Sequence, residues 1–263
     1  FDDPVTGELI DTLEADGAAV LVDDSTEDRR KQPDTITIVA KFCNLLNKEL
    51  DNRRRIAITL GANRAPIDAV RAIQNASSGQ TGWAIAEHLH RMGHDIICIA
   101  GKTSASPSFL LPDVRRAGTP DGMLSVSLEV AKSENMPEAW IHAAAVLDYY
   151  AHPEGGKRAS GEESWELTLS PGPKHIAKLS PLVGKSTRIG FKLEVGVSES
   201  VLVERAMEQI TAYGVDAVVA NLMGEVTDEN TPRCRIVKPD GSVHPMKDNL
   251  ELCEAIEAII SSN

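Results

Sequence analysis

The sequence lacks three features that would each assign the protein to a particular class. Its net charge is −12 at pH 7, so it has no excess of basic residues to form the positive face that nucleic-acid binding requires. No apolar run reaches membrane-spanning length. The four cysteines are scattered, with no Cys-x-x-Cys pair and no metal-ligand spacing. We therefore expect a cytoplasmic protein with reduced structural thiols, no nucleic-acid partner and no membrane contact.

The chain also lacks internal repeats, low-complexity tracts and long linkers. Its 263 residues are enough for one large α/β domain with an ample core. Residues 1–34 are acidic, then basic at 28–31, and we predict that they form an N-terminal arm. Residues 35–263 are predicted to form a single domain. Its leading segment, residues 35–54, is an amphipathic helix that we expect to pack against the main sheet.

The stretch from residue 55 to residue 100 predicts the centre of the fold. Arg55–Leu60 is a short apolar run typical of a buried strand, and Asp95–Ala100 is a second one. Between them, apolar positions recur at helical spacing from Trp83 to a stop at Gly93. This order is a βαβ unit, which requires parallel strands and a right-handed crossover. The small, polar loop over residues 75–82 opens the helix, where free backbone N–H groups favour an anion.

The rest of the chain continues this alternation of strands and helices. We predict helices over residues 120–132, 198–213 and 250–260, and strands over 139–146, 165–169, 188–193 and 216–220. Residues 171–176 are predicted to be a loop, and residues 233–238 and 242–246 to be the two strands of a hairpin. The fold expected is α/β: a Rossmann-like, doubly wound, mainly parallel sheet with a C-terminal β-hairpin extension. Such sheets bind ligands at the carboxyl ends of their strands.

Four motifs fall at or near these strand ends. They are Arg64-Ala-Pro-Ile-Asp-Ala-Val-Arg71, Asn75-Ala-Ser-Ser-Gly-Gln-Thr-Gly82, Ala143-Ala-Ala-Val-Leu-Asp-Tyr149 and Gly190-Phe-Lys-Leu-Glu194. Their lettering and order resemble the phosphopantothenoylcysteine synthetase (phosphopantothenate–cysteine ligase) family over about residues 35–263. The free-standing form is the better resemblance, because no upstream flavin-dependent decarboxylase domain appears in these residues.

The resemblance implies a ligase of coenzyme A biosynthesis. Such an enzyme joins 4′-phosphopantothenate to L-cysteine through an acyl-nucleotide intermediate and converts a nucleoside triphosphate to its monophosphate and pyrophosphate. The expected partners are therefore small molecules: 4′-phosphopantothenate, cysteine and either ATP or CTP. Mg²⁺ is expected to arrive with the triphosphate, no flavin is expected, and no residue is assigned to a metal. A homodimer is also implied.

The resemblance further implies a set of site residues. The catalytic candidates are Asn75, beside the anion-binding loop, and Lys157, in a glycine-rich flap over residues 150–164. The substrate-binding candidates are Arg71, Asn75, Ser77, Ser78 and Gly79. The nucleotide-binding candidates are Gly61, Asn63, Ala143, Ala144, Asp148, Lys174, Phe191, Lys192 and Arg205. Asn75 also has a purely structural interpretation, since asparagine is a common helix cap.

The chain departs from the family pattern at two places. Gly61-Ala62-Asn63 replaces the usual Gly-Gly-Thr of the first loop. Bacterial members also carry two lysines on the helix after residue 198, and these fall at Gln209 and Tyr213 here. The second departure leans away from the bacterial CTP pattern and suggests activity with ATP that at least equals activity with CTP.

Two other functions compete with the ligase. Residues 59–64 resemble the start of a short-chain dehydrogenase cofactor loop, but such enzymes need a Tyr-x-x-x-Lys motif. The residues four positions after the three tyrosines are Pro153, Glu154 and Ala217. A non-catalytic relative that keeps the nucleotide-binding fold is the second alternative, given the altered first loop. No Ser-His-Asp or Cys-His arrangement suggests an activated nucleophile, so catalysis would rest on positioning and charge stabilisation.

Overall fold

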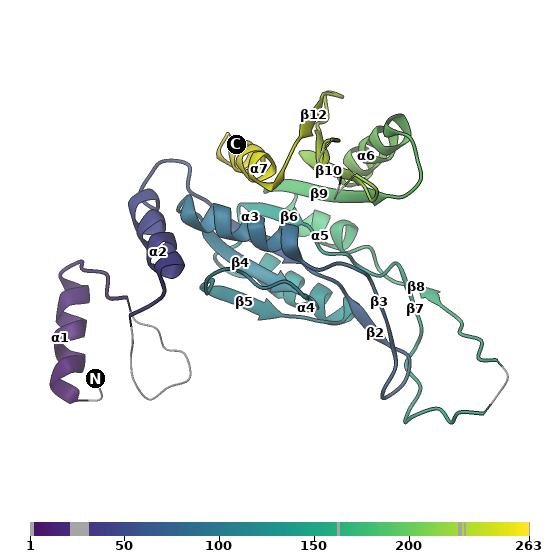
Figure 1. The fold of residues 1–263 in the computed structure, drawn as a ribbon, viewed down its shortest axis with the longest axis horizontal. Coiled ribbons are helices and arrows are strands. Elements are labelled where there is room, and N and C mark those ends of the chain that lie inside the picture. The colour runs from purple at the N-terminus through teal and green to yellow at the C-terminus, as the bar shows by residue number, and fades with distance from the viewer. Residues whose placement is uncertain (1–2, 22–31, 162–163, 226–227, 229, 263) are drawn as a thin grey trace.

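The centre of the molecule is an eight-stranded sheet, seen in a computed structural model that describes residues 3–21, 32–161, 164–225, 228 and 230–262 (Figure 1). The strand order is β12-β11-β10-β9-β6-β1-β4-β5. The strands are β1 (Arg55–Leu60), β4 (Asp95–Ala100), β5 (Asp113–Arg116), β6 (Ala139–His142), β9 (Thr187–Glu194), β10 (Ala217–Leu222), β11 (Cys234–Val237) and β12 (Val243–Met246). From β10 to β5 every neighbouring pair is parallel, whereas β11 and β12 form an antiparallel hairpin at the edge. The predicted sheet and its hairpin extension are confirmed.

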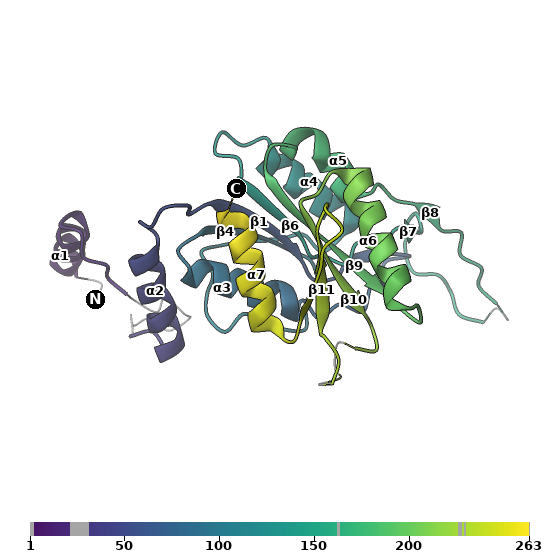
Figure 2. The ribbon, with the colours of Figure 1, turned by 90° about the horizontal axis from the view of Figure 1, so that it is seen from above.

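Helices cover both faces of this sheet (Figures 1 and 2). Alternate residues of a strand point to opposite faces, so one core forms on each side. Ile56 and Ile58 of β1 pack with α3 (Gln80–Arg91) and α7 (Asn249–Ser261). Ala57 packs on the other face, where α4 (Pro120–Ala131) and α5 (His175–Val183) lie. The helix α6 (Glu199–Tyr213) covers β10 on that second face.

Several predicted elements differ from those observed. Residues 165–169 form no strand; instead two-residue strands β7 (Tyr149–Tyr150) and β8 (Ser170–Pro171) pair with each other. Residues 165–169 alternate between apolar and polar like a strand, but the Trp165 ring packs against the Arg71 and Arg158 side chains instead of against a sheet. The strand β6 ends at His142, four residues early. The helix α5 starts at His175, inside the predicted loop, and β5 and the hairpin of β2 (Arg64–Pro66) and β3 (Ala72–Gln74) were not predicted.

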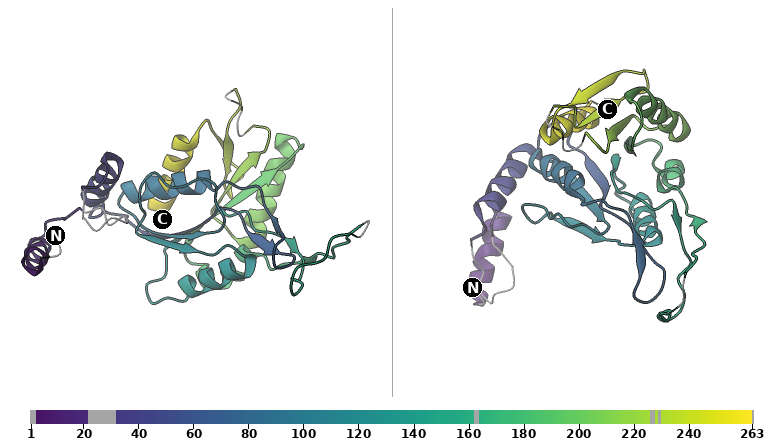
Figure 3. Two further views of the ribbon diagram at one scale, coloured as in Figure 1. Left: turned by 60° about the horizontal axis from the view of Figure 1, so that its bottom comes forward. Right: turned by 45° about the vertical axis from the view of Figure 1, so that its right-hand side comes forward.

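Part of the predicted N-terminal arm, residues 1–34, is helical. The helix α1 (Pro4–Ala15) buries none of its residues and stands away from the sheet (Figure 3). The basic run at 28–31 lies outside the described residues. The helix α2 (Thr35–Asn47) packs on α3 through Ala40 and through hydrogen bonds from its Asn44 and Asn47 side chains to the last carbonyls of α3. The helix thus packs mainly on α3, and its Ala40 joins the core on that face of the sheet.

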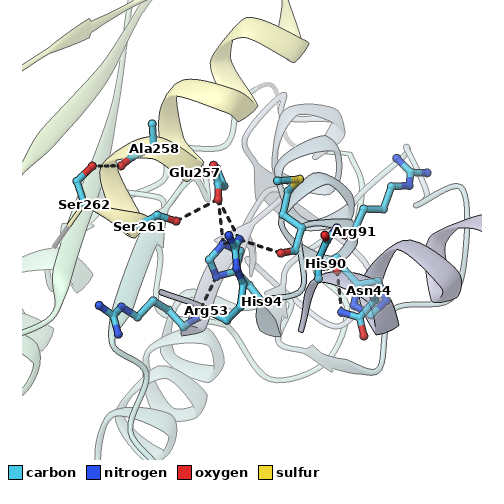
Figure 4. A network of polar contacts seen from close by, with 12 residues as sticks. Asn44, Arg53, His90, Arg91, His94, Glu257, Ala258, Ser261 and Ser262 are labelled. Carbon is cyan, nitrogen blue, oxygen red and sulfur yellow. Dashed lines mark hydrogen bonds and ion pairs between the residues drawn. The ribbon is translucent and has the colours of Figure 1, made fainter. Parts of the chain in front are cut away.

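A polar network joins three elements at the amino ends of the strands (Figure 4). The Arg53 guanidinium Nη1 donates to the Met92 carbonyl at 2.8 Å and to Glu257 Oε1 at 3.0 Å. The Arg54 N–H donates to Nδ1 of His94, whose side chain is fully buried. Burial, with the positive Arg53 beside it, lowers the pKa of His94 to about 4 against the opposing charge of Glu257. The network fixes α7 to the end of α3, on the edge opposite to the predicted site.

None of the helices in the described part of the chain has the length and apolar character needed to cross a membrane.

Candidate active site at the carboxyl edge of the sheet

Three loops meet where β1, β4 and β6 end. Gly61 has φ of +80°, and a Cβ there would lie 2.8 Å from the Lys102 carbonyl oxygen, so only glycine fits. The next residue, Ala62, exchanges two backbone hydrogen bonds of 2.8 Å with Lys102 of the β4 loop. The Asn63 N–H donates to the Ala145 carbonyl of the β6 loop at 3.1 Å. These hydrogen bonds join residues 61–63, Lys102 and Ala145 into one surface, which we call the floor. The predicted candidates Gly61 and Asn63 belong to it.

Asn75 lies on this floor. Its side-chain Nδ2 donates to the Ala145 carbonyl at 2.8 Å, the same carbonyl that accepts from the Asn63 N–H. The N-cap of α3 is Gly79, with no side-chain cap bond, so the interpretation of Asn75 as a helix cap is wrong. The side chain is half-buried, and its Oδ1 accepts no hydrogen bond from the residues that the structure describes. Asn75 therefore offers a side-chain acceptor that the described residues do not use.

The loop before α3 approaches the first loop closely because it is built from small residues. Gly79 has φ of +82°, and a Cβ there would lie 2.5 Å from Cγ2 of Thr103 and 3.5 Å from Cα of Gly61. The Ser78 carbonyl accepts from the N–H groups of the β4 loop at Ser104 and Ala105. The structure thus brings the predicted Gly61 and Gly79 together, at the N-terminus of a twelve-residue helix whose free N–H groups favour anions.

Two predicted nucleotide-binding residues pair with each other. Lys174, the residue before α5, places its Nζ 2.7 Å from Oδ1 of Asp148 in the β6 loop. Both side chains are about half exposed, which leaves each able to exchange this partner for a ligand. The backbone of the same loop is held by the Gly172 N–H, which donates to the Asp148 carbonyl.

Two further predicted cations share one carboxylate that sequence reasoning missed. Lys192 Nζ lies 3.0 Å from Glu194 Oε1, and Arg205 of α6 bonds to the other oxygen. Burial alone would raise the pKa of Glu194, but the hydrogen bond and charge of Lys192, with those of Arg205, outweigh it and lower that pKa. Phe191, beside this cluster, is half-buried and packs on the α3 side of the core. The cluster therefore carries only one net positive charge.

The family position at Tyr213 lies away from this edge, whereas Gln209 lies beside Gly190, which pairs with His142, the last residue of β6. The helix α6 follows β9, so it starts at the carboxyl edge and runs back toward the amino edge. The Gln209 amide fills the space beside Gly190 in the middle of β9, and the Tyr213 carbonyl accepts from Ser180 of α5. Arg188, at the start of β9, donates to the carbonyl of Gly214 just beyond. Tyr213 therefore lies at the far end of α6 from the site, and the expected activity with ATP stays a prediction.

Arg71 and Lys157 lie together in a different place. The loop after β7 that carries Lys157 projects from the body of the molecule, together with the β2–β3 hairpin (Figures 1 and 3). The Arg71 guanidinium is paired with Asp68 and donates to the Arg158 carbonyl. Lys157 itself is exposed, and the ion pairs of the described residues do not include it. Residues 162–163 of the predicted flap lie outside the described residues.

A cationic pocket of about 500 Å³ beside the N-terminus of α4 was not predicted. Its basic side chains, Arg64, Lys102 and Arg116, come from three different segments, so no local pattern gathers them. The rest of its lining is small or apolar: Pro66, Ala117, Gly118, Thr119, Gly122 and Val126. In a chain of net charge −12, these three side chains concentrate positive charge beside the floor, which favours anions at this edge.

Comparison with known proteins agrees with this geometry. A model of the family described as DNA/pantothenate metabolism flavoprotein C-terminal domain matches residues 52–262. The chain belongs to this family. It is 29% identical over 256 residues to the coenzyme A biosynthesis bifunctional protein CoaBC of Thermococcus kodakarensis, covering 97% of this chain and 63% of that protein. It is 31% identical over 184 residues to CoaBC of Methanocaldococcus jannaschii, covering 70% and 43%.

Solved structures show the same fold. The DNA/pantothenate metabolism flavoprotein from Streptococcus pneumoniae superimposes with a TM-score of 0.68 at 24% identity, covering 78% of this chain and 99% of that one. A Cab2 mutant in complex with phosphopantothenate-cysteine gives a TM-score of 0.63 at 17% identity, covering 86% and 93%. Since the chain spans less than two thirds of the length of the CoaBC proteins it matches, the activities of those whole proteins are not assigned to it by similarity alone.

Proposed function

We propose that this chain is a phosphopantothenate–cysteine ligase. The carboxylate of 4′-phosphopantothenate attacks the α-phosphorus of a nucleoside triphosphate, and pyrophosphate leaves. The cysteine amine then attacks the acyl carbon, a C–N bond forms, and the nucleoside monophosphate departs with the bonding electron pair. The proton lost by the amine passes to solvent.

The observation that carries this proposal is the position of the Asn75 amide on the floor of the site. Its Nδ2 is directed at the Ala145 carbonyl, and its Oδ1, near the N-terminus of α3, accepts no hydrogen bond within the described part of the chain. A neutral amide that can both donate and accept suits an acyl group that changes from carboxylate to mixed anhydride to amide. The N–H groups of the α3 N-terminus suit phosphate oxygens. Family membership supports the same reaction class.

The charges at this edge suit two anionic substrates. A carboxylate, a terminal phosphate and a triphosphate repel one another unless cations separate them. Lys174, Lys192 and Arg205 are the candidates on the β6, β9 and α6 side, and each is at present paired with a carboxylate. We propose that the substrate phosphates replace these carboxylates as the partners of the three cations. Lys157 is proposed to approach them from the projecting loop.

Mg²⁺ is proposed to enter with the triphosphate. No group of three or more potential metal ligands exists among the described residues. Mg²⁺ is commonly held by substrate phosphates, water and only one or two carboxylates, and Asp148 and Glu194 are two carboxylates at this edge. They fit an ion delivered by the nucleotide, whose chemistry would be to neutralise the phosphate charge.

The proposal is tested by incubating the purified chain with 4′-phosphopantothenate, cysteine, Mg²⁺ and either ATP or CTP. We expect pyrophosphate release and phosphopantothenoylcysteine, detected by mass spectrometry, with at least one nucleotide. Omitting cysteine should leave a single turnover that stops at the acyl-nucleotide. Nucleotide binding without pyrophosphate release in all mixtures would instead identify a non-catalytic relative. The rates with the two nucleotides at equal, limiting concentrations decide the preference between them.

A homodimer in the cytoplasm is part of the same proposal. The outward face of α2 is apolar, with Phe42 and Leu46 each about 60% exposed, which supports association through some surface of the chain. Light scattering of the purified chain, coupled to size-exclusion chromatography, measures the oligomeric state. A monomer at micromolar concentration with full activity would contradict this part.

A further inference from the structure

The loop that carries Lys157 is attached to the turn of the β2–β3 hairpin. We call residues 67–71 the seat and residues 154–158 the lysine segment. Two backbone hydrogen bonds join them: the Glu154 N–H donates to the Ile67 carbonyl at 2.8 Å, and the Ala69 N–H donates to the Gly156 carbonyl at 2.9 Å. Both segments project together from the body of the molecule (Figure 3).

One buried carboxylate holds the seat and the lysine segment together. The side chain of Asp68 is fully buried and accepts four hydrogen bonds or ion-pair contacts. Its Oδ1 accepts from the N–H groups of Val70 and Arg71 at 2.8 Å, which closes the seat on itself. Its Oδ2 accepts from the Arg158 N–H at 3.3 Å and from Nε of Arg71 at 3.2 Å. The two oxygens of this carboxylate thus have separate tasks.

The Arg71 side chain extends this connection. While its Nε contacts Asp68, its Nη2 donates to the Arg158 carbonyl at 2.6 Å. Its guanidinium carbon lies 4.6 Å from the centroid of the Trp165 ring, and that of Arg158 lies 5.1 Å from the same ring. Both distances are within the range of cation–π attraction. Trp165, on the far limb of the loop, is thereby fixed to the same point as the lysine segment.

Lys157 lies between the two residues that receive most of these contacts. Gly156 is held through its carbonyl, and Arg158 through both its N–H and its carbonyl, so the backbone of Lys157 is fixed while its side chain is exposed. We propose that Asp68, acting through Arg71, is a positioning residue that sets where the Lys157 ammonium can reach. Asp68 touches no substrate in this scheme. The inference rests on the proposed function only for the role of Lys157, whereas the attachment itself is independent of it.

Asp68→Asn separates the two tasks of the carboxylate. Asparagine keeps one oxygen, which can still accept from the N–H groups of Val70 and Arg71, and asparagine is well suited to such turns. Its NH₂ group cannot accept from the Arg158 N–H or from the Arg71 guanidinium. The variant should therefore preserve the hairpin and release the lysine segment. Trp165→Leu is the second variant, because it weakens the same attachment without altering the buried turn.

Limited trypsin digestion measures the release directly, since Lys157 and Arg158 are themselves cleavage sites. Cleavage requires a locally opened segment, so its rate reports the population of the opened form. We expect Asp68→Asn to accelerate cleavage after these two residues by on the order of tenfold or more, because two charge-assisted contacts are lost. Asp240→Asn is the matched control: Asp240 also accepts from a turn N–H, at Ser242, but lies in the β11–β12 hairpin. Unchanged cleavage in both Asp68→Asn and Trp165→Leu would overturn the attachment.

A double-mutant cycle tests whether the attachment serves Lys157. If Asp68 acts through Lys157, Asp68→Asn should lower turnover by about tenfold in the wild-type background but by less than about twofold in the Lys157→Gln background. Equal losses in the two backgrounds would assign Asp68 a merely structural role. If the wild-type chain makes no phosphopantothenoylcysteine, the proposed function and the role of Lys157 both fail, while the digestion result still decides whether Asp68 holds the loop.

Discussion

Asn75→Asp gives the sharpest test of the site, because the structure assigns each atom of the amide a different environment. In the wild type, Nδ2 donates to the Ala145 carbonyl at 2.8 Å. Aspartate has the same shape but no donor, and it would place a negative oxygen against that carbonyl. The side chain must then turn toward the space above the floor, where its charge meets the carboxylate and phosphates of the proposed substrates.

The expected loss of stability is small. One neutral hydrogen bond contributes about 0.5–1.5 kcal/mol to the free energy of unfolding. The Ala145 carbonyl keeps its bond from the Asn63 N–H, so no buried acceptor is left without a partner. For a chain of this size, about 1 kcal/mol corresponds to a fall in Tm of roughly 2–4 °C. Asn75→Ala should show a similar fall in Tm, because it loses the same bond without introducing a charge.

The expected loss of activity is much larger. The Nδ2 amide carries two N–H groups, and the bond to the Ala145 carbonyl uses one, which leaves the second for the acyl group. Removing one oriented donor from an acyl-transfer site typically lowers kcat by on the order of 100-fold or more, and an added negative charge should deepen the loss. The assay is pyrophosphate release together with quantification of acyl-nucleotide and final product. A variant that is blocked mainly in the second step should accumulate acyl-nucleotide. Synthesis within about twofold of wild type in Asn75→Asp would refute the assignment of Asn75 to the reacting acyl group.

Three further outcomes are expected. Lys157→Gln should lower turnover by about ten- to a hundredfold and leave Tm unchanged, because a charge-assisted contact to phosphate is worth roughly 1.5–3 kcal/mol. Unchanged turnover would remove Lys157 from the site. Gly82→Ala should destabilise the fold by about 1–3 kcal/mol in chemical denaturation, because its Cβ would lie 2.4 Å from Cβ of Leu60, whereas Gly155→Ala, with nothing within 4 Å, should have little effect. The free energy of unfolding should fall as the pH drops from about 6.5 to about 4, because His94 binds a proton more readily in the unfolded chain than in the folded one, where its pKa is lowered to about 4. Burial also lowers the pKa of His90 to about 4, so His94→Gln should reduce this pH dependence without removing it. An unchanged profile would show that His94 does not contribute.

The elements that could be predicted from sequence are those with a strong local pattern. The strands at 55–60 and 95–100 match the structure residue for residue, because a buried parallel strand is a continuous apolar run bounded by turn residues. Helices with side-chain caps, such as those that begin after Thr119 and Ser198, were found to within one residue. The family and the fold followed from motifs that lie at strand ends.

The elements that were missed depend on contacts between distant segments. The hairpin at 64–74 holds Pro66 and exposed polar residues, and its pairing is supported by the lysine segment 80 or more residues later. Likewise, the local sequence does not show that Lys192 and Arg205 share the carboxylate of Glu194. It also does not show that Lys174 is paired with Asp148. Sequence reasoning found the cations of the site but not the carboxylates that neutralise them, because ion pairing is decided by tertiary structure.

The packing of α7 on α3 has a consequence for how the chain folds during synthesis. Helix α3 belongs to the first βαβ unit, yet it shares its core with Leu252, Cys253 and Ile256 of α7, which follow every strand of the sheet in the chain. Until α7 is in place, the part of the core that α7 covers stays exposed, and Arg53 and His94 have no Glu257 to pair with. Folding of the central sheet is therefore expected to be completed only after α7 has been synthesised, which prolongs the exposure of an aggregation-prone intermediate. Truncation before residue 249 should accordingly yield aggregated protein, although every strand of the sheet would be present.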